Sequence, residues 1–392
     1  MDRSSAPLLR IRSAPMKRRL FLKACAVAAT AAAGCRSESN SAGTSGGAPK
    51  NEFPMTAGKY TILDLRSDSG NHDRAKQNAE AAISKYPNLN CMVGLYAYNP
   101  PTILRAVENA GKLDDIKIVG FDEDIETLKG IEEGKIYGTV VQQPFLFGFK
   151  SVEYLSALVR GQEVDVPDNK IIYVPHRVIR PDNAAQFKSD IQQMMAGKAP
   201  APKSERDDYD TKEPVSLAFL TNTVDPFWEL AERGVQCAEP IFNASCEVYH
   251  PPTASAEEQK RFIERKLNDD CQGLALSPID KENQKELINR ACDKMKVICH
   301  DSDAPDTNRL FYIGTGNYLA GRAVGKLVKE AIPDGGEVAI FVGKLEQLNA
   351  QERSQGVIDE LLDKPIPPEY AIGGEAAKPA EETPAASEPA PE

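Results

Sequence analysis

The chain has 392 residues, of which 41% are hydrophobic and 27% charged, and its net charge is −11. This length is enough for two domains of ordinary size, and the apolar content excludes global disorder. The acidic balance excludes a protein that holds nucleic acid on a basic surface.

The first 34 residues are predicted to be an export signal. A basic stretch precedes an apolar run over 24–33, which is too short to span a bilayer because a spanning helix needs about 20 apolar residues. Arg18 and Arg19 resemble a twin-arginine signal. The small residues before Cys35 resemble a lipobox, so we predict that Cys35 is lipidated and anchors the protein to a membrane.

Composition divides the rest of the chain. Residues 35–59 are rich in Ser, Gly, Ala and Asn and are predicted to form a flexible tether. Residues 196–214 are a polar linker, and the Ala/Pro/Glu-rich residues 366–392 are predicted to be a disordered tail. Two globular blocks remain, 60–195 and 215–365.

Both blocks alternate short apolar runs with amphipathic stretches, which is the pattern of βαβ units and parallel sheets. The strands predicted in the first block are 60–65, 91–95, 117–121, 137–141 and 171–174. Its predicted helices are 73–85, 101–109, 125–133, 147–159 and 183–194. The strands predicted in the second block are 215–220, 247–250, 273–276, 296–300, 310–313 and 337–342. Its predicted helices are 227–241, 256–267, 281–292, 318–331 and 350–361.

Polar and aromatic residues gather where these strands end. In parallel sheets the loops at the carboxyl ends of the strands form the binding crevice. The sequence therefore predicts a ligand cleft lined by residues that follow strands, among them Tyr96, Asp122, Gln142, Asp225 and Asp301.

Six cysteines lie beyond the predicted signal and tether, and two interpretations stay open for them. An exported protein can hold one or two disulfides, or the thiols can be free and buried. The spacing of the cysteines does not suit a zinc site. The residues Asp301, Ser302 and Asp303 could suggest calcium, but they lack the Gly and the later Glu of an EF-hand loop. We predict no metal and no cofactor.

Nine motifs carry a family resemblance. The second block contains LTNTVDPFW, GLALSPID, VICHDSDAP, YIGTGNYLAGR and NAQERSQG. It resembles the first half of a periplasmic sugar-binding protein of the ribose-binding type, the receptor of ATP-binding-cassette (ABC) importers. The first block contains ILDLRSDSGNHDRAKQNAE, CMVGLYAYNPP, KIVGFDED and YGTVVQQP, and it resembles the second half of that family.

The two halves stand in exchanged order, so the resemblance implies a circular permutant. The implied fold is α/β, with two doubly wound parallel-sheet lobes joined by a three-crossover hinge, the periplasmic binding protein type 1 fold. One lobe would combine residues from both ends of the chain. The join over 197–214 has 18 residues and is long enough to span up to about 60 Å when extended.

The second block supplies six candidate ligand contacts and a weaker seventh. Phe227 and Trp228 match the aromatics that stack on the sugar. Alternatively, they can form a hydrophobic staple at the start of the predicted helix 227–241. Asp225 matches a hydrogen-bonding Asn, and it can equally cap that helix. Asp301 matches an Asp that accepts from two sugar hydroxyls. Three further contacts are implied, with Asn349 the weakest: Asp303, Arg353 and Asn349.

The first block supplies four candidate contacts. Asp122 ends a buried strand in VGFDED, and Gln142 lies in VVQQP at a predicted crossover. Tyr96 stands where the family has Asn, and His72 stands where it has an aromatic residue. A solvated turn or a surface charge is the alternative interpretation of the charged candidates.

The resemblance implies a monomeric periplasmic receptor for a neutral pentose or hexose that delivers the sugar to the membrane subunits of an ABC permease. One alternative is a sensor that signals through a membrane kinase, and another is a periplasmic sugar-active enzyme. An enzyme is disfavoured because the sequence has no glycine-rich phosphate loop after a strand and no GxSxG motif.

Overall fold

The computed structural model describes residues 52–345 and 347–370, and it builds two β-sheets from them. Both sheets belong to a single unit of the structure, Ala48–Glu392. We call each sheet with its helices a lobe, named by the number of its strands.

The seven-stranded lobe has a mainly parallel sheet with an antiparallel strand at each edge. Its strands, in spatial order, are β1 (Met55–Ala57), β2 (Tyr60–Ser67), β13 (Gly336–Val342), β3 (Leu89–Gly94), β4 (Lys117–Phe121), β5 (Gly138–Val141) and β7 (Arg177–Ile179). Its helices are α1 (His72–Lys85), α2 (Asn99–Asn109), α3 (Ile125–Glu132), α5 (Ala184–Met195), α9 (Asn317–Ala331) and α10 (Leu348–Leu361).

The six-stranded lobe has an all-parallel sheet. Its strands, in spatial order, are β6 (Ile171–Tyr173), β12 (Tyr312–Gly314), β11 (Lys296–His300), β10 (Gly273–Leu276), β8 (Val215–Leu220) and β9 (Ala244–Tyr249). Its helices are α4 (Pro144–Val159), α6 (Pro226–Ala238), α7 (Ala256–Lys266) and α8 (Lys285–Cys292).

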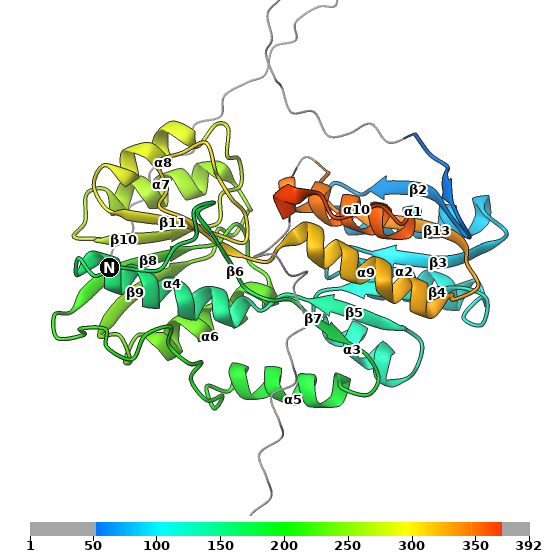
Figure 1. Cartoon of the computed structure of the whole chain (residues 1–392), viewed down its shortest axis with the longest axis horizontal. Coiled ribbons are helices and arrows are strands. Elements are labelled where there is room, and N and C mark those ends of the chain that lie inside the picture. Colours follow the sequence, from blue (N-terminus) through cyan, green and yellow to red (C-terminus); the bar gives the residue numbers. More distant parts are fainter. Residues whose placement is uncertain (1–51, 346, 371–392) are drawn as a thin grey trace, which may run out of the picture. The chain divides into compact units, whose positions relative to one another are not determined.

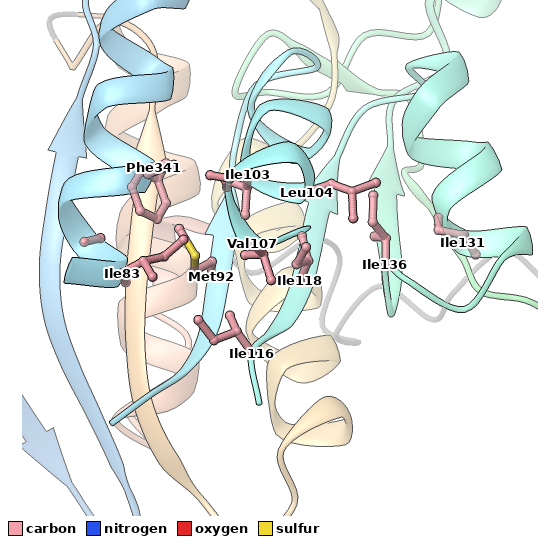
Figure 2. Packing of buried hydrophobic residues seen from close by; sticks show 14 of the residues in the cluster. Ile83, Met92, Ile103, Leu104, Val107, Ile116, Ile118, Ile131, Ile136 and Phe341 are labelled. Carbon is pink, nitrogen blue, oxygen red and sulfur yellow. The ribbon is translucent and has the colours of Figure 1, made fainter. Parts of the chain in front are cut away.

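Helices cover both faces of each sheet, which explains why the central strands are continuous apolar runs rather than alternating ones. In the seven-stranded lobe, α1, α2, α3 and α5 cover one face, and α9 and α10 cover the other (Figure 1). Figure 2 shows the first of these layers, where Ile103 and Val107 of α2 pack on Met92 and Ile118 of the sheet. The predicted α/β class with two parallel-sheet lobes is confirmed.

The seven-stranded sheet combines the two ends of the described chain. Strand β13 is inserted between β2 and β3 and pairs in parallel with both. The expectation that one lobe draws on both blocks is therefore confirmed, whereas the exchanged order relative to the family stays a prediction. One expectation was wrong. Residues 169–195 were expected to lie entirely in the lobe that combines both ends of the chain, but β6 pairs with β12 and so belongs to the six-stranded lobe.

Three short segments cross between the lobes, in addition to the linker that leads from α5 to β8. They connect β5 to α4, β6 to β7, and β12 to α9. At the first crossing, the side-chain amide of Gln143 donates to the carbonyl of Pro175 in the second crossing, at 2.7 Å. This bond ties two crossings to each other, so Gln143 serves the hinge, whereas its neighbour Gln142 reaches Asp122.

Three predicted irregular segments contain more order than their composition suggests. Strand β1 lies within the predicted tether and pairs with β2. The short 3-10 helix η1 (Pro368–Tyr370) lies within the predicted tail, and its Tyr370 stacks on Tyr318 of α9 at 4.2 Å. The linker also packs on the six-stranded lobe, where the carboxylate of Glu153 accepts from the amide of Glu205 at 2.7 Å.

Arg160 fastens the end of this linker, and we predict that Arg160→Ala destabilises the protein by about 1–3 kcal/mol. Its guanidinium donates to the carbonyl of Glu213 at 2.6 Å and to that of Phe242 at 2.8 Å. The control is Arg261→Ala, because Arg261 is exposed and pairs with Glu257 at 3.5 Å, so its loss should change stability by less than about 0.5 kcal/mol. Urea denaturation compares the two, and equal losses would contradict the anchoring role.

The predicted export signal, the Cys35 lipidation site, and most of the predicted tether and tail lie outside the described residues. Within the described ranges, no helix has both the length and the apolar character needed to cross a bilayer. All six cysteines of the described part are free, which answers the open question of the thiols in favour of free cysteines. Burial raises the pKa of the Cys91 thiol to about 12.

Candidate functional site

Two aspartates occupy corresponding positions in the two lobes. Asp122 directly follows β4, and Asp301 directly follows β11. Both have a left-handed backbone, with φ of 68° and 57°. The amide of Asp122 donates to the carbonyl of Val140 at 2.8 Å, and that of Asp301 donates to Ile313 at 3.2 Å. A left-handed conformation is unfavourable for residues other than Gly, so its occurrence at both strand ends marks these carboxylates as functional candidates.

The carboxylate of Asp122 is nearly enclosed, since the residue is 8% exposed. It accepts a hydrogen bond from the side-chain amide of Gln142 at 3.0 Å. Burial raises the pKa of Asp122 to about 6, although the nearby Arg353 guanidinium acts in the opposite direction. The structure therefore brings two of the predicted ligand contacts, Asp122 and Gln142, together.

The carboxylate of Asp301 is also buried but is held only by long hydrogen bonds. It accepts from the hydroxyl of Ser277 at 3.3 Å, from the side-chain amide of Asn222 at 3.4 Å and from the hydroxyl of Ser302 at 3.4 Å. Burial raises the pKa of Asp301, and Arg353 opposes this rise. These weak contacts leave Asp301 able to accept stronger hydrogen bonds from a ligand.

Arg353, on α10, acts electrostatically on both carboxylates. Its positive charge opposes the rise in the pKa of Asp122 and of Asp301. It is 2% exposed, and its Nε donates to the side-chain oxygen of Asn317 at 2.8 Å. Its guanidinium carbon lies 4.2 Å from the centre of the Phe121 ring. Within the described part of the chain, Nη2 of Arg353 has no hydrogen-bond partner, so this cation retains a free donor.

The close crossing of α9 and α10 sets the position of Arg353. A Cβ added to Gly321 would lie 2.1 Å from the carbonyl oxygen of Arg353, and one added to Gly356 would lie 2.1 Å from that of Tyr318. Only glycine permits this approach of the two backbones. The same crossing anchors Arg353 through Asn317, the first residue of α9.

The candidate residues at the start of α6 make contacts within the protein. Asp225 caps the helix, because its carboxylate accepts from the amide of Phe227 at 2.9 Å. Trp228 is 2% exposed and packs edge-on against Phe227, with ring centres 4.9 Å apart. Its indole N–H donates to Asn222 at 3.0 Å. Stacking of Phe227 or Trp228 on a sugar stays a prediction.

The remaining aromatic candidates lie near the start of α1 and after β3. His72 is exposed and stacks on Tyr98, with ring centres 4.3 Å apart. The hydroxyl of Tyr96 donates to the side chain of Gln347 at 2.7 Å, and burial raises the pKa of Tyr96 to about 12. Both residues therefore already have partners in the protein.

Asp303 and Asn349 are also occupied by contacts within the chain. The guanidinium of Arg309 forms a two-point ion pair with Asp303, with one bond at 2.5 Å, and both side chains are largely buried. The side-chain oxygen of Asn349 accepts from the amide of Ala350 at 2.8 Å. As direct ligand contacts these two residues are weaker candidates than Asp122, Asp301 and Arg353.

A pocket of about 520 Å³ is lined by residues of both lobes. Of the predicted contacts it is lined by Asp301, Asp303 and Asn349. The other candidates do not line it, although Arg353 adjoins it through Asn317, which does. The described residues contain no group of three or more His, Cys, Asp or Glu placed to hold a metal ion.

Sequence reasoning missed three polar residues that hold the predicted ones in place. They are Asn222, Ser277 and Asn317. Each lies within a motif that carries the resemblance and directly follows or closely follows a strand. Their position after strands was therefore the available signal.

Comparison with known proteins gives a family match. A family model described as a periplasmic binding protein domain matches residues 48–163 and 218–388. Ribose import binding protein RbsB of Salmonella typhimurium and that of Escherichia coli are each 28% identical to the chain over 126 residues. Each alignment covers 31% of the chain and 42% of the relative, so the chain spans less than half the length of these relatives.

Two solved structures of transport proteins are also similar. One is an ABC transporter solute-binding protein of Burkholderia graminis in complex with D-arabinose, with 29% identity, a TM-score of 0.37, and coverage of 40% of this chain and 54% of that one. The other is GanP, a glucose-galactose binding protein of Geobacillus stearothermophilus, with 27% identity, a TM-score of 0.36, and coverage of 38% and 54%.

Proposed function

Because the chain belongs to the periplasmic binding protein domain family, we propose that it is a receptor that binds a monosaccharide between its two lobes. The observation that carries the proposal is the arrangement around Arg353. Its charge acts on Asp122 of one lobe and on Asp301 of the other, and its Nη2 has no partner in the described part of the chain. Carboxylates and a guanidinium at one place match the hydroxyl groups that rim a sugar.

The proposed mechanism is hinge closure. A sugar that accepts from Arg353 and donates to Asp122 and Asp301 would bond to both lobes, and it would therefore favour the state in which they are closed. Hydrogen bonds to charged groups contribute roughly 1.5–3 kcal/mol each. A few of them, with neutral contacts, are enough for micromolar affinity, which corresponds to about −8 kcal/mol.

The proposal also covers where the receptor acts and to which protein it delivers the sugar. The receptor would be exported through the signal of residues 1–34, anchored by lipidated Cys35, and would act as a monomer that hands the sugar unchanged to an ABC permease. The proposed circular permutation is supported by the order of the motifs along the chain, and the pairing of β13 between β2 and β3 is compatible with it.

The experiment is isothermal titration of the purified protein with ribose, xylose, glucose, galactose and inositol. We expect at least one of these compounds to bind with micromolar affinity and to be recovered from the solution chemically unchanged. At a ligand concentration 1,000 times Kd, binding should stabilise the fold by about 4 kcal/mol, which thermal unfolding detects. Absence of heat and of stabilisation with all five compounds would contradict a receptor for a neutral monosaccharide.

The affinity should depend on pH through Asp122. A carboxylate accepts hydroxyl donors only when it is ionised, and burial raises the pKa of Asp122 to about 6. If only the ionised form binds, affinity should be nearly constant above pH 7 and about tenfold weaker at pH 5. Titration at pH 5, 6, 7 and 8 measures this, and equal affinity at pH 5 and 7 would show that Asp122 does not accept from the sugar.

A further inference from the structure

The pocket of about 520 Å³ beside Asp301 has an excess of acidic groups. It lies among the loops after β10 and β11, the start of α10, and η1. Two lysines line it, Lys281 and Lys344, and Lys281 lies 4.0 Å from Glu282. Against them stand the six lining carboxylates Asp280, Glu282, Asp301, Asp303, Glu352 and Glu369. Even with Asp303 neutralised by Arg309, carboxylates outnumber cations, and such a pocket attracts positive charge.

Among these six carboxylates, Glu352 is the one most clearly left without a hydrogen bond or ion pair in the described structure. It lies on α10 beside Arg353, and it is partly buried. Among the hydrogen bonds and ion pairs of residues 52–345 and 347–370, none involves its side chain. Burial raises the pKa of Glu352 to about 7, and the charges of Arg353 and Lys281 only partly oppose this rise. A cation in the pocket would compensate this charge.

A second, independent observation points to a polar ligand in the same pocket. Thr315 lines it and is 1% exposed, yet its hydroxyl has no hydrogen-bond partner in the described part of the chain. Buried hydroxyls are normally hydrogen-bonded, so an orphaned one is expected to bond to an occupant. Aromatic rings complete the lining, with Tyr318 and Tyr370 stacked at 4.2 Å. Aromatic faces favour cations as well as sugar rings.

The cleft around Asp122 shows the same imbalance. Both carboxylate oxygens of Glu123 are buried without a hydrogen-bond partner in the described residues. Burial raises the pKa of Glu123, and Asp122 and Asp225 act in the same direction. A positively charged group on the ligand would favour the ionised forms of these carboxylates beyond what Arg353 provides, whereas an anionic sugar would oppose them.

We infer that the ligand is an amino sugar whose ring contacts Asp301 and whose ammonium group occupies the adjoining pocket beside Glu352 and Thr315. The inference rests on the proposed function, since it specifies the sugar that the same cleft takes. It revises the expectation of a neutral pentose or hexose. The ammonium donates to the Glu352 carboxylate and to the Thr315 hydroxyl.

The test compares sugars that differ only at one position. Glucosamine and galactosamine are titrated at pH 7 against glucose, galactose and their N-acetyl derivatives, which retain the nitrogen without its charge. We expect the better amino sugar to bind at least about tenfold more tightly than both its neutral parent and its N-acetyl derivative, as a charge-assisted hydrogen bond would produce. Glu352→Gln should reduce this preference to about threefold or less.

Controls separate the possible failures. Glu286→Gln changes an exposed carboxylate of α8 outside the pocket and should leave the preference within about twofold. A neutral parent that binds as tightly as its amino sugar would overturn the inference and leave the sugar receptor standing. Failure of every sugar to bind would overturn both. An unchanged preference in Glu352→Gln would overturn the assignment of the pocket.

Discussion

Replacing Arg353 with Met is expected to weaken sugar binding by about 100-fold or more. Met keeps much of the apolar bulk that packs on Phe121 but removes the donors, including Nη2, which is free in the described structure. Two lost charge-assisted hydrogen bonds account for about 3 kcal/mol or more. The variant also loses the charge that lowers the pKa of Asp122 and Asp301, so both carboxylates will be protonated more readily.

Titration calorimetry at pH 7 measures the effect, with circular dichroism to verify the fold. Arg353→Lys should recover only part of the affinity, because an ammonium keeps the charge without the planar fork. Arg261→Met is the control for loss of a surface guanidinium and should bind as the wild type does. Wild-type affinity in Arg353→Met would remove Arg353 from the site.

Replacing Asp122 with Asn is expected to weaken binding and to stabilise the protein without ligand. The amide keeps a partner for Gln142 but lacks the charge that accepts sugar hydroxyls, so affinity should fall about 10–100-fold. The effect on the free energy of unfolding has the opposite sign, because the substitution is expected to increase it at neutral pH. Because the pKa of Asp122 is raised to about 6 from 3.8, the contribution of this carboxyl to stability is fully present below about pH 4 and is lost as pH rises through 6.

Urea denaturation at pH 4 and pH 7 tests this second claim. Asn cannot ionise, so the stability of Asp122→Asn relative to wild type should increase from pH 4 to pH 7. Each unit of pKa shift corresponds to about 1.4 kcal/mol, which sets the scale of the increase. A variant that loses both affinity and stability would instead mean that Asp122 serves the fold, and that its left-handed backbone is a structural feature.

The sequence predicted the parallel strands well because burial on both faces makes each one an uninterrupted apolar run. Strands β8, β10 and β11 have the predicted bounds. The edge strands β1 and β7 were missed, since each has only three residues and is mostly half-buried, so neither carries a periodic signal. Helix α8 starts at Lys285 rather than at 281, because Asp280 and the residues after it form a hydrogen-bonded turn.

The site was predicted in part. Asp122, Gln142 and Asp301 came from their positions after strands and from the resemblance, whereas Arg353, which lies within α10, came from the resemblance alone. The partners of Asp303 and Tyr96 were not predictable, because Arg309 and Gln347 reach them through tertiary packing. The pocket beside Asp301 also depends on η1, which lies in a segment whose composition predicts disorder. Composition reflects only the local conformational preference of a segment. The stacking of Tyr370 on Tyr318 is a tertiary contact, and it orders this segment against that preference.

The central claim is that both lobes bind the same small carbohydrate. The most direct measurement follows the fluorescence of Trp228, the one tryptophan in the sequence, while a sugar that binds the wild type is titrated into Asp122→Asn and Asp301→Asn. The claim predicts a saturable change in the wild type and at least about tenfold weaker binding in each variant, although the two substitutions lie in different lobes. Full affinity in either variant would contradict it.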